Sequence, residues 1–253
     1  MKPHEVKAAV DRIRVVTYNV HKCRGIDGSV RPERIVGVLQ EIDADIIALQ
    51  EVLSSEGGGP EVDQAGYIAA ALGLKSYMGE NRRLNGGAYG NLLLSRHPVH
   101  SASNYDISTK GRERRGCLRV DLQVGGASLL HVFNVHLGTS YLERRKQARM
   151  LVTSEILNNV GLRGARIVMG DFNEWTRGLT TRLLSSQFES VDVLKYLRRS
   201  RTYPGVLPLL HLDHIYFDRT LRLEQLAVYR SREALIASDH LPFLAEFRVP
   251  TTG

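Results

Sequence analysis

The sequence predicts an α/β fold, of the α/β or α+β kind, in which sheets pack face to face and helices cover their outer faces. Many short segments rich in β-branched residues are separated by turn formers, which is typical of buried strands. Only a few segments carry apolar residues at helical spacing, and these are scattered among the strands. Many strands with few helices favour a layered arrangement of this kind.

The strands are predicted from short apolar runs. In chain order they are Arg14–Val20, Asp45–Gln50, Gly90–Ser95, Leu118–Val124, Ser128–Val135, Arg166–Met169, Leu212–Phe217, Leu221–Val228 and Leu241–Val249. Two stretches between them, Ser54–Gly59 and Asn81–Gly87, have the composition of loops inside a domain. No Gly/Ser-rich or Pro-rich linker interrupts the sequence, so we expect a single domain over residues 1–253.

Three helices are predicted between the strands. The first, Pro32–Ile42, has a proline in its first turn and apolar residues at helical spacing. The second, Pro60–Leu72, stops before Gly73. The third, from Tyr141 to about Val160, is heavily charged in its first half, which we expect to face solvent.

The composition excludes several classes of protein. Hydrophobic residues make up 43% of the chain and charged residues 24%, unlike disordered or collagen-like proteins. The 34 Lys and Arg residues outnumber the 27 Asp and Glu residues, which gives a formal charge of +7. This charge favours an anionic partner whose binding weakens with salt, although the excess could equally be spread over a solvated surface.

The two cysteines, Cys23 and Cys117, are too few for a disulfide framework and too far apart for a zinc or redox motif, so we expect reduced thiols. Residues 1–14 hold no apolar stretch of the signal-peptide kind. No later run reaches the roughly 18 apolar residues of a membrane-spanning helix. We therefore expect a cytoplasmic protein, acting as a monomer.

Polar residues follow the apolar runs of the strong strands, where the strand pattern does not require them. A carboxylate buried there must be neutralised, hydrogen-bonded or bound to a metal. Taken singly, Glu51 could begin a loop, Asp171 could cap a turn and His136 could be a core histidine. Six such clusters together favour a shared site. They are Thr17-Tyr18-Asn19, Leu49-Gln50-Glu51, Asn134-Val135-His136-Leu137, Gly170-Asp171-Phe172-Asn173, Leu212-Asp213 and Ser238-Asp239-His240.

The side chains in these clusters agree with one kind of chemistry. Oxygen ligands such as Glu51 and Asp239 suit Mg²⁺ or Mn²⁺, whereas a zinc site would hold more His or Cys. Asp171 and His240 add acid and base groups. Donors that could hold the extra charge of a phosphoryl transition state are Asn19, Asn173 and His136.

In their order and spacing, the six clusters resemble the motif series of the endonuclease/exonuclease/phosphatase superfamily, over roughly residues 12–249. The resemblance implies a four-layered αββα sandwich like that of DNase I, with two packed mixed sheets flanked by helices and the motif loops at one edge. The likeness extends to a compact bacterial branch of metal-dependent hydrolases. It is carried there by Asn19-Val20-His21-Lys22, Tyr89-Gly90-Asn91 and Asn173-Glu174-Trp175.

The resemblance also implies roles for the metal and the attacking water. Glu51 would be the principal ligand of Mg²⁺, with Mn²⁺ as the alternative, and Asn19 and Asp239 would assist it. Asp171 would align or deprotonate the attacking water. Asn173 would orient Asp171 and touch the phosphate.

Further roles concern the phosphate oxygens. By the same resemblance, His240, held as an imidazolium by Asp213, would stabilise the non-bridging oxygens together with His136. A His240–Asp213 pair could serve as the base instead. Relatives often carry Arg after the Asp of the Leu-Asp motif, where this chain has His214.

Three basic clusters are candidates for contact with an anionic substrate. The first and third flank motif-bearing segments, and the second belongs to the charged helix, which we interpret as a solvated face. Aromatic residues that could stack on bases are scattered, and Trp175 is the nearest in sequence to the motifs, although core packing would explain it equally well. The clusters are Lys110, Arg112, Arg114 and Arg115; Arg144, Arg145, Lys146 and Arg149; and Arg198, Arg199 and Arg201.

The leading hypothesis is a Mg²⁺-dependent phosphodiester hydrolase that acts on nucleic acid through in-line attack of an activated water. The apolar segment Tyr203–Leu210 supports an alternative, because an exposed apolar loop beside basic residues suits a phospholipid or sphingomyelin phosphodiesterase. A buried loop would carry no such meaning. A phosphomonoesterase is a third enzyme, and a catalytically silent module that binds nucleic acid or lipid is the non-enzymatic alternative.

Overall fold

The computed structural model describes residues 11–124, 128–175, 178–190, 202–204 and 210–249. Its first sheet contains the strands β1 (Asp11–Asn19), β2 (Ile46–Ser54), β3 (Lys75–Leu84), β4 (Gly87–Ser95), β11 (Arg222–Val228) and β12 (Phe243–Val249). Its second sheet contains the strands β5 (Val99–Asp106), β6 (Gly116–Val124), β7 (Ser128–His136), β8 (Ala165–Asp171), β9 (Glu189–Ser190) and β10 (Asp213–Phe217). The described helices are η1 (His21–Cys23), α1 (Pro32–Ile42), α2 (Gln64–Leu72), α3 (Tyr141–Leu151), α4 (Leu179–Ser185) and α6 (Ala234–Ala237).

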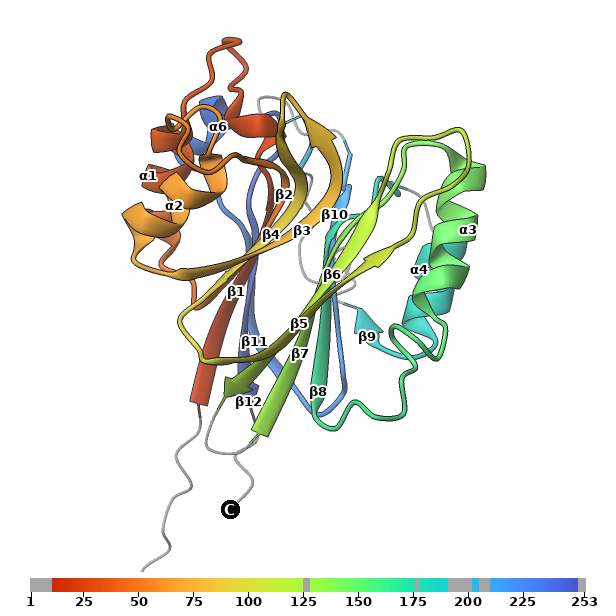
Figure 1. Cartoon of the computed structure of the whole chain (residues 1–253). Helices are drawn as coiled ribbons and strands as arrows, with labels where there is room; N and C mark the ends of the chain where they lie inside the picture. Colours follow the sequence, from red (N-terminus) through yellow and green to blue (C-terminus); the bar gives the residue numbers. More distant parts are fainter. Residues whose placement is uncertain (1–10, 125–127, 176–177, 191–201, 205–209, 250–253) are drawn as a thin grey trace, which may run out of the picture.

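The strands follow the order β11-β12-β1-β2-β4-β3 in the first sheet and β5-β6-β7-β8-β10-β9 in the second. Within the described residues, β1 pairs with β2 and β7 with β8 in parallel, while the other pairs are antiparallel. Figure 1 shows the sheets face to face, with α1, α2 and α6 outside the first and α3 and α4 outside the second. The predicted four-layered sandwich of two mixed sheets is confirmed.

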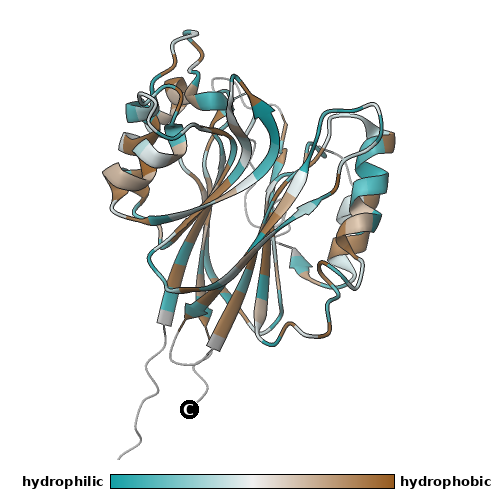
Figure 2. Cartoon of the chain, viewed as in Figure 1, coloured by the Kyte–Doolittle hydropathy of each residue, from teal (hydrophilic) through white to brown (hydrophobic). Residues whose placement is uncertain are grey.

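Apolar side chains fill the three spaces between these layers. Val15 and Ile46 belong to a buried cluster between the two sheets. Their neighbours Val16 and Ile47 belong to the cluster under α1 and α2, because successive side chains of a strand point to opposite faces. A third cluster packs the second sheet against the end of α3. Figure 2 shows the hydrophobic residues running along the strands of both sheets.

The helix predictions need three corrections. Helix α1 has the predicted bounds, but α2 begins at Gln64 rather than Pro60, where Asp63 accepts a hydrogen bond from Gly66. Helix α3 ends at Leu151, well before Val160. Part of its charged first half is buried rather than solvent-facing. No helix in the described part is long and apolar enough to cross a membrane.

The predicted loop Asn81–Gly87 is largely a hairpin. Strands β3 and β4 pair across it and are joined at Asn85 and Gly86, which have positive φ angles of 51° and 83°. An Asn-Gly pair in this conformation matches the twist of a two-residue hairpin turn. The strand β3 escaped prediction because its polar residues Glu80, Asn81, Arg82 and Arg83 hide the apolar pattern.

The strand register brings the polar clusters to one edge of the sandwich, the upper edge in Figure 1. In the first sheet, Asn19 at the end of β1 is level with Gln50 of β2. In the second sheet, His136 at the end of β7 is level with Asp171 at the end of β8. Strand β10 runs the other way, so its first residue, Asp213, is also level with Asp171. The strand register, parallel and antiparallel, therefore gathers the candidate residues before any side-chain contact is considered.

Candidate active site

The carboxylate of Asp171 is the centre of the site, and its side chain is almost fully buried. Its Oδ2 accepts a hydrogen bond from Asn19 Nδ2 at 3.0 Å, which joins the two sheets. The same oxygen lies 3.6 Å from His136 Nε2 and 3.7 Å from His240 Nε2. Its Oδ1 accepts the backbone N–H of Asn173 at 2.9 Å. Four residues predicted from separate motifs thus meet at one carboxylate.

Gly170 lets β8 carry Asp171 this close to β7. Its φ is 152°, and a Cβ added there would lie 1.8 Å from the carbonyl oxygen of Val135. Any side chain would therefore push β8 away from its parallel neighbour. The glycine of the Gly-Asp-Phe-Asn motif is a packing requirement that positions the carboxylate.

Glu51 reaches the site through a β-bulge. The register of β2 against β4 shifts between Leu49 and Val52, and Glu51 has a φ of 60°. Such a bulge re-aims a side chain, and here Glu51 Oε1 lies 3.4 Å from Asn19 Nδ2. Glu51 is thus part of a strand that continues to Ser54, and the simple explanation that it begins a loop is wrong.

The next segment, η1, holds a strained backbone. His21, Lys22 and Cys23 have consecutive φ angles of 47°, 58° and 53°, a region that residues other than glycine rarely adopt. Two bonds hold it: Gln64 Nε2 donates to the carbonyl of Lys22 at 2.7 Å, and the backbone N–H of His21 donates to Asn19 Oδ1 at 3.0 Å. This backbone conformation places the side chains of His21 and Lys22 beside the carboxylates of Asp239 and Glu51.

Lys22 contacts Glu51 directly, with its Nζ 2.8 Å from Oε2. Burial of Glu51 opposes its ionisation, but the positive charge that His136 takes up in acid and the charge of Lys22 hold the pKa of this carboxyl well below its usual range. Glu51 is therefore ionised at neutral pH. The sequence analysis quoted Lys22 only as part of the resemblance and gave it no role.

Asp239 contacts the strained segment η1 and its own neighbour Ser238. Its Oδ1 lies 3.5 Å from His21 Nδ1 and 3.4 Å from Ser238 Oγ. Ser238 also donates to the backbone carbonyl of Asn19 at 2.8 Å, which ties the loop before β12 to the end of β1. The Asp239 side chain is about one third exposed, so it borders the site from the solvent side.

The two histidines beside Asp171 differ in charge. Burial alone would lower the pKa of His240, but Asp213 and Asp171 raise it to about 10. Asp213 is fully buried, and its Oδ2 lies 3.0 Å from His240 Nδ1. In contrast, burial and the charge of Arg115 lower the pKa of His136 to about 4. At neutral pH the site therefore holds one imidazolium and one neutral imidazole.

Comparison with known proteins places this geometry in a family. A sequence profile described as the Endonuclease/Exonuclease/phosphatase family matches residues 16–240. The chain belongs to this family. The resemblance of the six motifs is thereby confirmed.

Similar sequences and similar folds match nearly the whole length of this family member. The Uncharacterized protein YbhP of Escherichia coli K12 is 30% identical over 252 residues, covering 93% of this chain and 96% of YbhP. A functionally unknown conserved protein from Enterococcus faecalis V583 superposes with a TM-score of 0.77 at 21% identity, covering 94% of this chain and 100% of that one. A mannosyl-6-phosphatase of Bacteroides thetaiotaomicron VPI-5482 gives a TM-score of 0.74 at 17% identity, covering 93% and 99%.

The oxygen donors of this family member suit a hard divalent cation. Among the described residues, no three His, Cys, Asp or Glu side chains are arranged to hold a metal. Magnesium, however, needs only one or two carboxylates because it keeps several waters. The ionised Glu51 supplies one such carboxylate, and the ammonium of Lys22 lies 2.8 Å from its Oε2. Asn19 turns its Nδ2 toward Glu51, while its Oδ1 accepts the backbone N–H of His21.

Two residues near the site were named in the sequence analysis without the roles that the structure gives them. Arg115, placed among a basic cluster, is buried and acts on the charge of His136. Tyr89 lies beside Glu51, and burial together with that carboxylate raises the pKa of its phenol, which stays protonated. The pairing of β6 and β4 with the motif strands explains both positions, and no local pattern in the sequence reveals them.

His214 does not replace the arginine of the relatives as a phosphate contact. It follows Asp213 in β10 and so points to the opposite face, where its Nε2 lies 2.9 Å from the carbonyl oxygen of Glu174. Its ring packs against Phe172 and Tyr216. The third basic cluster, within residues 198–201, and residues 205–209 of the apolar segment lie outside the described residues.

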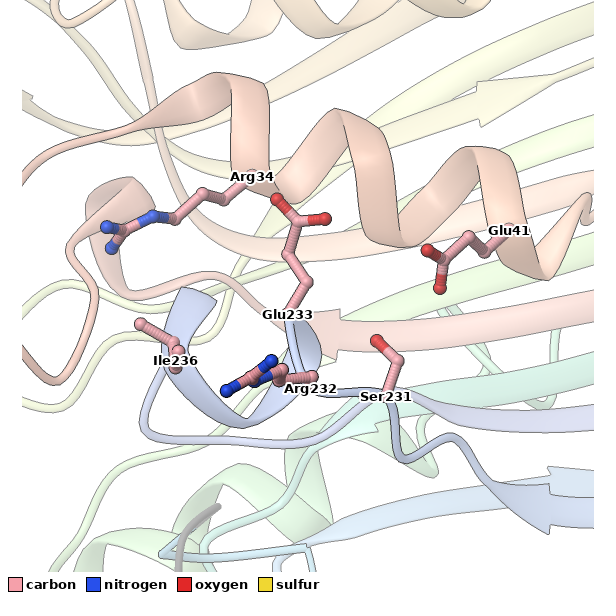
Figure 3. A pocket seen from close by; sticks show the side chains of 6 residues that line it. All are labelled: Arg34, Glu41, Ser231, Arg232, Glu233 and Ile236. Carbon is pink, nitrogen blue, oxygen red and sulfur yellow. The ribbon is translucent and has the colours of Figure 1, made fainter.

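A surface hollow of about 550 Å³ lies away from these residues, between α1 and the segment that contains α6. Figure 3 shows Arg34 and Glu41 of α1 on one side and Ser231, Glu233 and Ile236 on the other. None of the predicted site residues lines it. The candidate active site is therefore the strand edge around Asp171, not this hollow.

Proposed function

We propose that this family member is a Mg²⁺-dependent phosphodiester hydrolase that acts on nucleic acid, as a cytoplasmic monomer of one domain. The observation that carries the proposal is the convergence of Asn19, His136, Asn173 and His240 on the buried carboxylate of Asp171. Membership of the family supports hydrolysis of a phosphate ester. The net charge of +7 favours a polyanionic substrate.

Asp171 is the proposed base. Its two oxygens are held by Asn19 and by the backbone of Asn173, so the carboxylate is already oriented before substrate binds. The water oxygen attacks phosphorus in line, its proton passes to Asp171, and the bond to the leaving oxygen breaks. His240 is an imidazolium at neutral pH and cannot accept a proton, which favours Asp171 over the His240–Asp213 pair.

The same histidines hold the charge that accumulates on phosphorus. The imidazolium of His240 keeps its charge through the buried Asp213 and stabilises the non-bridging oxygens. Neutral His136 donates a hydrogen bond without adding charge. Asn173, fixed by its Nδ2 to the carbonyl of Leu137 at 2.9 Å, borders the phosphate.

Glu51 and Asn19, with Asp239 from the solvent side, are the residues that would hold Mg²⁺, with Mn²⁺ as the alternative. A bound ion would supply positive charge that offsets the negative charge developing during phosphoryl transfer. Glu51 is suited to this because its setting keeps it ionised. The oxygen donors favour these ions over zinc.

The decisive experiment is a substrate panel of plasmid DNA, single-stranded DNA, RNA, phospholipid vesicles and small phosphomonoesters, with Mg²⁺, Mn²⁺ or chelator. Nucleic acid should be cleaved with metal and spared with chelator. Asp171→Asn and Glu51→Gln should each lower turnover by about 10²-fold or more. Glu56 is exposed and belongs to none of the predicted motifs, so Glu56→Gln is the matched control for the loss of a carboxylate. Release of lipid head groups or of inorganic phosphate alone would replace the nucleic-acid assignment.

A further inference from the structure

Trp175 is an exposed indole on the loop that follows Asp171. It is the single tryptophan of the chain, and 53% of its surface is accessible. The explanation that it belongs to the core is therefore wrong. Its neighbours are firmly held, because Asn173 binds the carbonyl of Leu137, and Glu174 accepts the backbone N–H of Thr181 at 2.8 Å. The indole of Trp175 is thus held at the surface by the buried residues Asn173 and Glu174 that precede it.

Arg144 of α3 supports this ring from the protein side. Its Cζ lies 5.4 Å from the centre of the indole, within the range of a cation–π contact. The residue is only 6% exposed, contrary to the prediction of a solvated face. Its Nη1 donates to the carbonyl of Gly138 at 3.3 Å, in the loop that follows His136.

The charge of Arg144 is incompletely satisfied. Its Nη1 donates only to the backbone carbonyls of Gly138 and Thr139. Its buried Nε has no hydrogen-bond partner, and within the described part of the chain Arg144 forms no ion pair. The charges of Glu174, Glu143 and Asp171 act on it, so it lies within electrostatic reach of the proposed base. A buried cation without an ion-pair partner is costly, and the cost falls when an anion arrives.

We propose that Trp175 and Arg144 form a platform for an unpaired nucleobase next to the scissile phosphate, with the indole stacked on the base and the guanidinium beneath the indole adding positive charge at the site. The inference rests on the proposed function and narrows it to single-stranded nucleic acid. Stacking on an aromatic ring requires a base that is not already stacked and paired in a duplex. The cation beneath the indole favours a polyanion over an apolar membrane surface.

The single tryptophan gives the platform its own signal, because the intrinsic fluorescence of the protein reports on Trp175 alone. Wild-type protein in chelator would be titrated with a dT octamer, with an abasic octamer of the same charge, with the matching duplex, and with phosphatidylglycerol vesicles. We expect quenching by the dT octamer and little change with the abasic strand or duplex. Equal responses to dT and abasic strands, no response, or a blue shift with vesicles alone would overturn the platform.

Variants add a second measurement, the affinity for a labelled dT octamer by anisotropy. Trp175→Ala should weaken binding about 5- to 150-fold, and Trp175→Phe should restore part of it. Binding of the abasic strand should not change. Val160 is 97% exposed and lies in the segment before β8, at the opposite edge, so Val160→Ala is the matched loss of an exposed apolar side chain. Unchanged affinity in Trp175→Ala would overturn the inference.

Failure of the platform and failure of the proposed function give different results. Wild-type protein that cleaves single-stranded nucleic acid or a base-free diester, bis(4-nitrophenyl) phosphate, with Mg²⁺ but shows no response of Trp175 retains the proposed function and loses the platform. Wild-type protein that cleaves no diester contradicts the proposed function itself.

Discussion

At the scale of the residue, the two histidines beside Asp171 differ in charge because a different charged residue lies near each of them. His240 has the buried Asp213 behind it and is charged at neutral pH, while His136 has Arg115 near it and is neutral. The sequence could predict His240 and Asp213 as partners through the motif series. It could not predict the charge of His136, because Arg115 reaches it through the pairing of β6 with β7, not through proximity in the chain.

Lys22 leads to a prediction about metal affinity at the same scale. Its ammonium occupies Glu51 Oε2 at 2.8 Å, so it competes with a divalent cation for that oxygen. Lys22→Met should therefore tighten Mn²⁺ or Mg²⁺ binding about 10-fold, measured by calorimetry on the otherwise unchanged protein. Lys75, exposed at the other end of the first sheet, provides the matched control Lys75→Met. Unchanged or weaker metal binding in Lys22→Met would contradict the competition.

At the scale of the element, the buried apolar strands were predictable and the polar ones were not. β1, β2, β7 and β8 contain apolar runs, whereas β5 alternates half-buried and exposed residues and lies at an edge. The bulge that turns Glu51 into the site also has no local signal, because it is defined by the register of β2 against β4. Tertiary pairing therefore decides details of the site that periodicity cannot reach.

A buried amide network holds the two sheets together just below the site. Asn134 Nδ2 of the second sheet donates to the carbonyls of Leu49 and Leu92 in the first, each at 2.9 Å, and Gln50 Nε2 donates to Asn134 Oδ1 at 2.8 Å. Asn134→Leu removes this buried donor from both carbonyls, and Gln50 Nε2 keeps only its longer bonds, to Thr17 Oγ1 at 3.1 Å and to the Ala48 carbonyl at 3.3 Å. We expect the free energy of unfolding to fall by about 2–5 kcal/mol.

Urea unfolding measures this loss. Asn158 also donates to a backbone carbonyl, that of Val152 at 2.8 Å, but it is exposed, so water can replace its bond. The control Asn158→Leu should therefore cost less than about 1 kcal/mol. Equal losses in the two variants would show that the inter-sheet network adds nothing to stability.

A pH prediction comes from the pairing of β6 with β7, where Asp121 faces His131. Burial would raise the pKa of Asp121, but His131 at 2.7 Å and Ser101 at 2.5 Å, together with Arg119, lower it below its usual value. A carboxyl with a lowered folded pKa stabilises the protein above its unfolded pKa of about 4, and this stability is lost as pH falls through the folded value.

Asp121→Asn should therefore reduce stability at neutral pH and flatten the loss of stability between neutral and strongly acidic pH. Urea midpoints measured across that range would test it. A variant that loses stability with acid as steeply as the wild type would mean that Asp121 does not contribute to the acid sensitivity.

At the scale of the whole molecule, the fold class was predictable because many strands with few helices leave few other ways to bury apolar faces. The four layers share their central core. Ile13 and Val15 of the first sheet and Val132 and Ile167 of the second belong to the same buried cluster. Separating the sheets would expose this cluster, so we expect them to unfold together as one domain.

The two cysteines report on this cooperativity because they lie in different layers. Cys23 packs in the cluster under α1 and α2, and Cys117 packs in the cluster of the second sheet facing α3. Both are fully buried, and burial raises the pKa of each thiol, so neither should react with a disulfide reagent in the folded protein.

In urea, Cys23→Ala and Cys117→Ala variants isolate one thiol each. If the sheets form one cooperative unit, the remaining thiols should become reactive over the same urea range once the midpoints are corrected for each variant's stability. Reaction of one thiol at a markedly lower urea concentration would show that its layer opens separately. The shared core would then not couple the unfolding of the two sheets.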